Sequence, residues 1–238
     1  MDIKSYLENI YIVPILIFSV VIHEMAHGWV ALRCGDTTAK EMGRLTLNPI
    51  PHIDLFGSIL VPLFSILATG RVLIAWAKPV PIDPRNFSNF KRDDSLVTAA
   101  GPVSNFIIAF ICSVFVIIVH KLTVEFIGGD NDSMAFEFMN FLYNMFAYGI
   151  FLNVALAIFN LIPIPPLDGS HLLANLLPEE AAFRYRRIGF LGIFIILGLF
   201  NFVPGFAKIF FSIIIFFTMP FLNFISIFIP EFSKLYFG

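Results

Sequence analysis

Two histidines and a glutamate interrupt a long apolar stretch near the start of the chain. The motif His-Glu-Met-Ala-His occupies residues 23–27, between the apolar runs 12–22 and 29–32. Histidines four residues apart lie on one face of a helix, about 5–6 Å apart at Cβ, so both can bind one metal ion. Ionisable groups at membrane depth are costly and therefore usually functional. Because Glu24 could accept a proton from water at that metal, the motif predicts metal-assisted hydrolysis within a membrane.

The composition is that of a membrane protein with several spans. Of the 238 residues, 58% are hydrophobic and only 13% are charged, whereas a soluble domain carries about 25% charged residues. The net charge is −2 and there is no basic tract, so nucleic acid is not an expected partner. Cys34 and Cys112 show no disulfide or metal-binding spacing, and we interpret both as packing residues.

Apolar segments of the roughly 20 residues that a membrane helix needs recur along the chain. Clear candidates are 9–32, 96–120, 140–162, 187–203 and 206–229. A further stretch, 55–77, contains two glycines, a proline and an arginine, and would either span the bilayer or re-enter it. We predict an all-α polytopic membrane protein with about five to six transmembrane helices and a possible re-entrant segment at 55–77. Residues 1–238 are expected to form one membrane-embedded domain, with a catalytic core at about 9–175 and C-terminal helices at 187–229.

The distribution of lysine and arginine favours a re-entrant 55–77 segment. With the N-terminus outside, that arrangement places 12 of the 15 basic residues on the cytoplasmic side, in accord with the positive-inside rule. These residues are Arg33, Lys40, Arg44, Arg71, Lys78, Arg85, Lys91, Arg92, Arg184, Arg186, Arg187 and Lys234. The histidine motif, the 101–105 turn and the 165–169 segment then face the same side, so the active site is predicted toward the cytoplasm.

A catalytic zinc site needs a third protein ligand, and Asp168 is the best-placed candidate. It follows the segment 159–167, in which three prolines disfavour a helix, and it precedes Gly169. By itself Asp168 could be the N-cap of a helix at 170–177. Its inferred depth, shared with the two histidines, favours the metal-ligand interpretation. Glu41 lies between basic residues in a polar loop and is better explained by a solvated ion pair.

Together these motifs resemble the site-2 protease family of intramembrane zinc metalloproteases. The matching parts are the motif at 23–27, the turn at 100–105 and the run 160–169, and they cover about residues 9–175. The resemblance implies one Zn²⁺ per chain, bound by His23, His27 and Asp168, with Glu24 as the catalytic base. It also implies membrane-protein substrates that are cut within or near their transmembrane segments. The chain is similar to the small prokaryotic members without an inserted PDZ domain, which implies a multi-pass protein of the prokaryotic inner membrane.

Three further residues are candidates for supporting roles. Asn105, early in its helix, could bind substrate or only join neighbouring helices. Asn160 and His171 could hold the metal ligands in place, although helix packing would explain Asn160 equally well.

Two other functions are compatible with the same metal ligands. A membrane metal-ion transporter would need no base beside the first histidine and would tolerate Glu24→Gln. A non-catalytic scaffold would be expected to close its zinc site with four protein ligands. The sequence does not specify the substrate or the oligomeric state.

Overall fold

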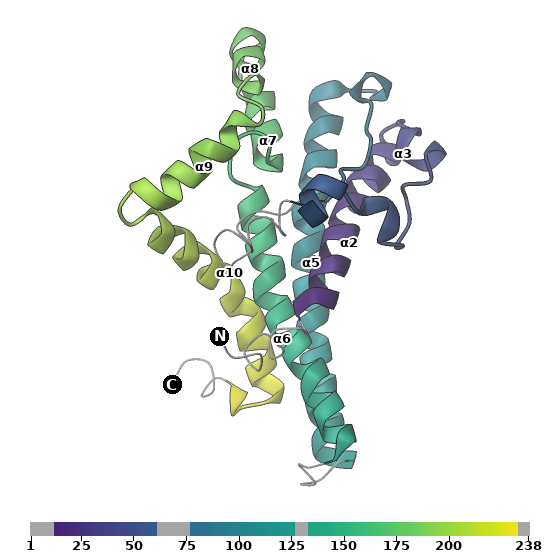
Figure 1. Cartoon of the computed structure of the whole chain (residues 1–238), viewed down its shortest axis with the longest axis vertical. Coiled ribbons are helices and arrows are strands. Elements are labelled where there is room, and N and C mark those ends of the chain that lie inside the picture. Colours follow the sequence, from purple (N-terminus) through teal and green to yellow (C-terminus); the bar gives the residue numbers. More distant parts are fainter. Residues whose placement is uncertain (1–11, 61–76, 127–132, 233–238) are drawn as a thin grey trace. The chain divides into compact units, whose positions relative to one another are not determined.

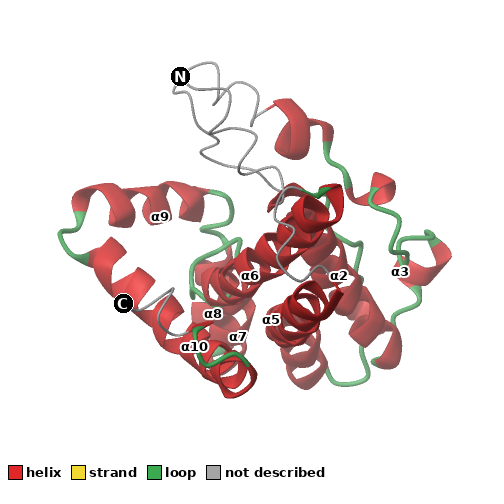
Figure 2. Cartoon of the chain, turned by 90° about the horizontal axis from the view of Figure 1, so that it is seen from below, coloured by secondary structure: helices red, strands yellow, loops and turns green. Residues whose placement is uncertain are grey.

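The computed structural model describes residues 12–60, 77–126 and 133–232 (Figure 1). This described part consists of helices and loops (Figure 2). Four of its helices are long and apolar enough to cross a membrane, and a fifth span is possible if a bent helix pair is counted as one. The prediction of an all-α polytopic membrane protein is confirmed.

The chain divides into two compact units, which are described separately. One unit comprises Val20–Gly101, and the other comprises Met1–Ser19 together with Pro102–Gly238. The helices α2, Ile12–Arg33, and α5, Phe90–Phe126, each contribute residues to both units.

In the unit 20–101, α2 ends at Arg33, and Gly35 takes a φ of +107° that favours glycine. Short helical turns follow α2 along the chain: α3, Thr38–Glu41; η1, Ile50–His52; η2, Leu55–Leu60; and η3, Pro84–Asn86. Of the expected re-entrant segment 55–77, the structure describes residues 55–60, as the π-helical turn η2, and Ala77 at its end. The rest of that segment, up to residue 76, lies outside the described residues.

Helix α5 begins earlier than its apolar stretch predicts. The Asn89 side chain accepts a hydrogen bond from the Arg92 amide, and Asp93 Oδ2 accepts one from the Asn89 amide, which together cap the helix at its N-terminus. From this start α5 continues for 37 residues, or roughly 55 Å. The Gly101-Pro102 pair, expected at a turn, therefore lies inside a continuous helix.

The second unit is built from α6, Met134–Asn160; α7, Asp168–Leu176; α8, Glu179–Arg186; α9, Leu191–Phe202; and α10, Phe206–Phe228. α10 packs along α6, as both views show (Figures 1 and 2). Ring pairs join the helices: Phe115 stacks on Phe146 at 4.8 Å, and Phe110 lies 5.4 Å from Phe224. At Gly149 of α6, an added Cβ would meet Cys112 and Ile15 at 2.9 Å, so glycine permits close helix approach.

The predicted span 187–203 contains one short helix, α9, preceded by a break. α8 and α9 are bent by 77° across a short break. α9 has 12 residues, or roughly 18 Å, which is shorter than the roughly 30 Å core of a bilayer. Gly189, with a φ of +49°, allows the chain to turn between the two helices.

Candidate metal centre

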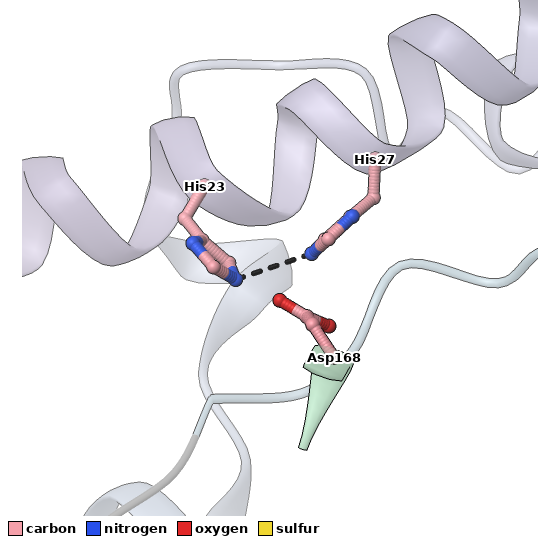
Figure 3. Close-up of side chains that lie close together, drawn as sticks. All are labelled: His23, His27 and Asp168. Atoms are coloured by element: carbon pink, nitrogen blue, oxygen red, sulfur yellow. Dashed lines mark hydrogen bonds between the residues drawn. The ribbon is translucent and has the colours of Figure 1, made fainter. Parts of the chain in front are cut away.

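The two histidines of the motif meet at their Nε2 atoms. His23 and His27 project from one face of α2 (Figure 3), and their Nε2 atoms lie 3.1 Å apart. Nitrogen ligands of one tetrahedral zinc ion, each about 2.0–2.1 Å from it, would be roughly 3.3 Å apart. Both side chains are only 8% exposed. The pair therefore fits two ligands of a single, largely buried metal ion.

The backbone of α5 selects the tautomer of His27. His27 Nδ1 lies 2.7 Å from the Val97 carbonyl oxygen. A carbonyl only accepts hydrogen bonds, so Nδ1 carries the proton and donates it. The lone pair of neutral His27 is therefore on Nε2, the atom that faces His23. Ligating histidines commonly have such a partner on their second nitrogen, because it fixes the ring orientation.

Gly101 leaves the space in front of the two imidazoles open. A Cβ at this position would lie 2.6 Å from His23 Nε2 and even closer to His27 Nε2. Any side chain there would occupy the volume into which both nitrogens point. The sequence presents Gly101-Pro102 as a turn, whereas the structure gives Gly101 a steric role within α5.

We expect Gly101→Ala to impair metal binding. Overpacking a buried site is destabilising by about 1–3 kcal/mol, which corresponds to a loss of zinc affinity of roughly five- to hundredfold. Competition with a fluorescent chelator would measure this loss. Gly198→Ala is the matched control, because an added Cβ there meets nothing within 4 Å. Equal zinc affinity in the two variants would contradict the steric role of Gly101.

Glu24 is fixed by a backbone donor. Its Oε2 accepts a hydrogen bond of 2.9 Å from the amide of Val80, a residue 56 positions further along the chain. The bond engages one carboxylate oxygen. Because a carboxylate has two acceptor oxygens, the other remains able to accept a proton.

Asp168 belongs to the other unit, where it is the first residue of α7. Figure 3 draws it together with the two histidines. The N-cap position is taken by Leu167, so Asp168 lies in the first helical turn and is not the N-cap. A carboxylate in that turn is favoured by the helix dipole.

The loop before Asp168 is tightly enclosed within its own unit. A Cβ at Gly169 would overlap the Leu161 carbonyl group, and one at Gly192 would overlap the Pro165 carbonyl oxygen. The Tyr185 hydroxyl donates to the Pro163 carbonyl at 2.7 Å. Backbone contacts on both sides of the loop thus define the direction in which α7 begins.

The remaining candidates have identifiable local surroundings. Asn160 donates to the Leu156 carbonyl of its own helix at 3.0 Å, and His171 is exposed on α7. Asn105 is completely buried, and its Nδ2 donates to Asn153 Oδ1 at 2.9 Å. Asn153 in turn donates to the Gly149 carbonyl. In this arrangement Asn105 joins α5 to α6.

We expect Asn105→Ala to act mainly on stability. Interhelical hydrogen bonds in membrane proteins contribute on the order of 1 kcal/mol, so unfolding in detergent should become easier by about that amount while bound zinc is unchanged. Asn153→Ala is the matched variant, because it removes the other half of the same pair. A loss of cleavage rate confined to Asn105→Ala would instead indicate contact with substrate.

Comparison with known proteins assigns the family. Residues 11–200 match peptidase family M50. The chain is 40% identical over 190 residues to "Putative zinc metalloprotease YwhC" of Bacillus subtilis (strain 168), covering 80% of each chain. It is 28% identical over 204 residues to "Putative zinc metalloprotease Rip2" of Mycolicibacterium smegmatis, covering 84% of this chain and 70% of that protein. Comparison with solved structures gives no match.

The matched range, residues 11–200, covers most of the chain and contains the positions of the histidine motif, Gly101 and Asp168. They agree with the resemblance that the three motifs carry. The apolar helices add that the protein crosses the membrane several times. The chain belongs to peptidase family M50, the site-2 protease family of membrane metalloproteases.

Proposed function

We propose that this protein is an intramembrane protease with one zinc ion, which cuts membrane proteins within or near their transmembrane segments. The observation that carries the proposal is the His23–His27 pair, with Nε2 atoms 3.1 Å apart and Gly101 leaving the space before them open. Asp168 is proposed as the third ligand. Two imidazoles and one carboxylate form a donor set typical of catalytic zinc, which keeps a further position open for water or substrate.

The chain's own residues then account for the proton transfers. Zinc, when bound, acidifies water and polarises a peptide carbonyl. Glu24 accepts the proton from the attacking water and returns it to the leaving amine as the peptide bond breaks. The Val80 amide holds one oxygen of Glu24, so the carboxylate cannot rotate freely during these transfers. His27 keeps its orientation through the Val97 carbonyl.

The substrate class follows from where the motif lies. His23, Glu24 and His27 belong to a helix that is apolar and long enough to cross a membrane. A helical peptide bond is shielded by its own turn, so a substrate helix must unwind before hydrolysis. Segments with helix-weakening residues such as glycine and proline are therefore the expected targets.

The experiment that tests this function uses the full chain in proteoliposomes with a library of single-span peptides. Mass spectrometry should locate cleaved bonds within or beside the membrane segment. A zinc chelator should abolish cleavage, and added zinc should restore it. Cleavage that persists after the chelator has removed zinc, or that occurs only in distant soluble tails, would contradict the proposal.

The active site is proposed to face the cytoplasm. Single cysteines at exposed positions on either side of α5, Ser88→Cys and Met134→Cys, test this in a background lacking Cys34 and Cys112. In intact cells a membrane-impermeant reagent should label position 134 and spare position 88 until the cytoplasmic face is opened. The reverse pattern would place the site toward the outside and would leave the metal ligands unaffected.

A further inference from the structure

The segment Lys78 to Asp83, here called the Pro-Val-Pro segment, lacks a backbone N–H group at two of its positions. Pro79 and Pro81 have no N–H group, so Val80 supplies the one backbone donor between positions 79 and 81. The Val80 N–H donates a hydrogen bond of 2.9 Å to Glu24 Oε2. The Val80 side chain is 6% exposed.

Packing against α2 holds the segment close to Glu24. At Gly28, one turn after Glu24, an added Cβ would lie 2.9 Å from Val80 Cγ1 and 2.7 Å from Leu45 Cδ2. Glycine at this position therefore allows the Pro-Val-Pro segment to lie directly on the helix surface. The Val80 amide consequently reaches a side chain of α2.

Arg44 fixes the start of the segment. Its Nη2 donates to the Lys78 carbonyl at 2.9 Å and to the Pro79 carbonyl at 3.2 Å. Arg44 is only 7% exposed, and hydrogen bonds from a buried guanidinium are among the stronger ones in proteins. These two carbonyls directly precede the Val80 amide, so the Arg44 contacts set the position of that donor.

Asp36 fixes the end of the segment. Its carboxylate is fully buried and accepts 2.8 Å hydrogen bonds from the Asp83 amide and from Asn86 Nδ2. Burial opposes ionisation, but the hydrogen bonds from Thr38, Asn86 and Asp83 outweigh it and lower the pKa of the Asp36 carboxyl. Asp36 therefore stays charged at neutral pH and keeps these donors bound.

We propose that the Pro-Val-Pro segment is a positioning element for Glu24, in which Arg44 and Asp36 hold the backbone so that the Val80 amide fixes one carboxylate oxygen. The proposal rests on the function of Glu24 proposed above and assigns Val80, Arg44 and Asp36 to it. The Lys78 and Pro79 carbonyls accept from Arg44, the Lys78 amide donates to the His52 carbonyl, and the Val80 amide donates to Glu24. The segment thus presents its Val80 donor to the proposed base.

The direct test replaces the donor. Val80→Pro removes the N–H and puts a third proline in an already proline-rich, non-helical stretch. The hydrogen bond is made to a charged acceptor, so kcat for a single-span reporter peptide should fall by about ten- to hundredfold. KM should stay within about twofold and bound zinc should be unchanged. Ile82→Pro, the same change two positions on, should reduce kcat far less.

Two results would overturn the proposal. One is a kcat for Val80→Pro within about twofold of wild type. The other is Val80→Ala, which keeps the N–H, losing as much kcat as Val80→Pro, because packing of the side chain would then explain the effect.

A second pair of variants works if Val80→Pro does not fold. Arg44→Met removes the donor to both carbonyls, and Arg44→Lys retains a charged donor for one of them. We expect Arg44→Met to lower kcat with zinc still bound, and Arg44→Lys to recover part of the loss. A zinc-loaded Arg44→Met enzyme with unchanged kcat would contradict the proposal.

A measurement without catalysis separates this proposal from the proposed function. In protein labelled with ¹⁵N-valine, the Val80 amide proton resonance should move upfield in Glu24→Ala, because a hydrogen bond to a carboxylate is lost. An unchanged resonance would disprove the positioning contact whatever Glu24 does. Full peptidase activity of Glu24→Gln would instead disprove the proposed role of Glu24 and leave the resonance result standing.

Discussion

Glu24→Gln should abolish peptide cleavage and leave zinc bound. Glutamine has nearly the same size and can still hydrogen-bond, but it cannot accept the water proton. General-base catalysis contributes about 10²–10⁴-fold to a rate, so the variant should lose at least about a hundredfold in kcat. Cleavage of a single-span peptide in proteoliposomes and metal analysis of the same sample would measure both quantities.

The two readouts distinguish the remaining interpretations. A rate within about tenfold of wild type would remove Glu24 as the base and favour a transporter that uses the same ligands. Loss of zinc together with activity would make Glu24 a metal ligand or a structural residue. Glu179→Gln, a change of the same chemistry in the exposed first turn of α8, is the control and should behave as wild type.

Asp168→Ala should lose both zinc and activity. Removing groups that merely support a ligand lowers metal affinity by about 10–100-fold, so removing a ligand itself should lower it by at least about a hundredfold. Because metal binding is coupled to folding, the thermal midpoint should also fall, and added zinc should raise it less than in wild type. Chelator competition and thermal unfolding in detergent measure the two effects.

Zinc loss in Asp168→Ala could come from the missing ligand or from disruption of α7, and a control variant separates the two causes. Stoichiometric zinc that survives Asp168→Ala would rule out Asp168 as a ligand. Leu176→Ala is the matched control, since it removes an exposed side chain from the same short helix. If both variants lost zinc equally, the effect would come from disruption of α7.

Much of the candidate site could be predicted from the sequence, because the residue patterns that indicate it lie within a few turns of the chain. A histidine pair at i and i+4 lies on one face of any helix, and an apolar stretch longer than about 20 residues makes that helix a membrane span. A short helix at 170–177 was considered as the alternative explanation of Asp168, and a helix is found at Asp168–Leu176. These expectations depend on spacing and hydropathy within a few turns of chain.

Other features depend on contacts between distant residues. The sequence shows Gly101-Pro102 as a break, yet α5 runs through it, because neighbouring groups can compensate for the hydrogen bond that a proline removes from a membrane helix. The bend between α8 and α9 is likewise absent from the hydropathy of 187–203. The composition of a segment shows how apolar it is, but it does not show in which direction the helix runs.

The sequence by itself determined the class of protein and four of its spans, and it predicted the residues of the metal-binding motif. Tertiary structure decided how that motif is held: the Val97 carbonyl on His27, the Val80 amide on Glu24, and Arg44 and Asp36 on the Pro-Val-Pro segment. Backbone carbonyls and amides are present at every residue and leave no signature in the sequence. Only the folded path of the chain brings a particular carbonyl or amide to a particular side chain.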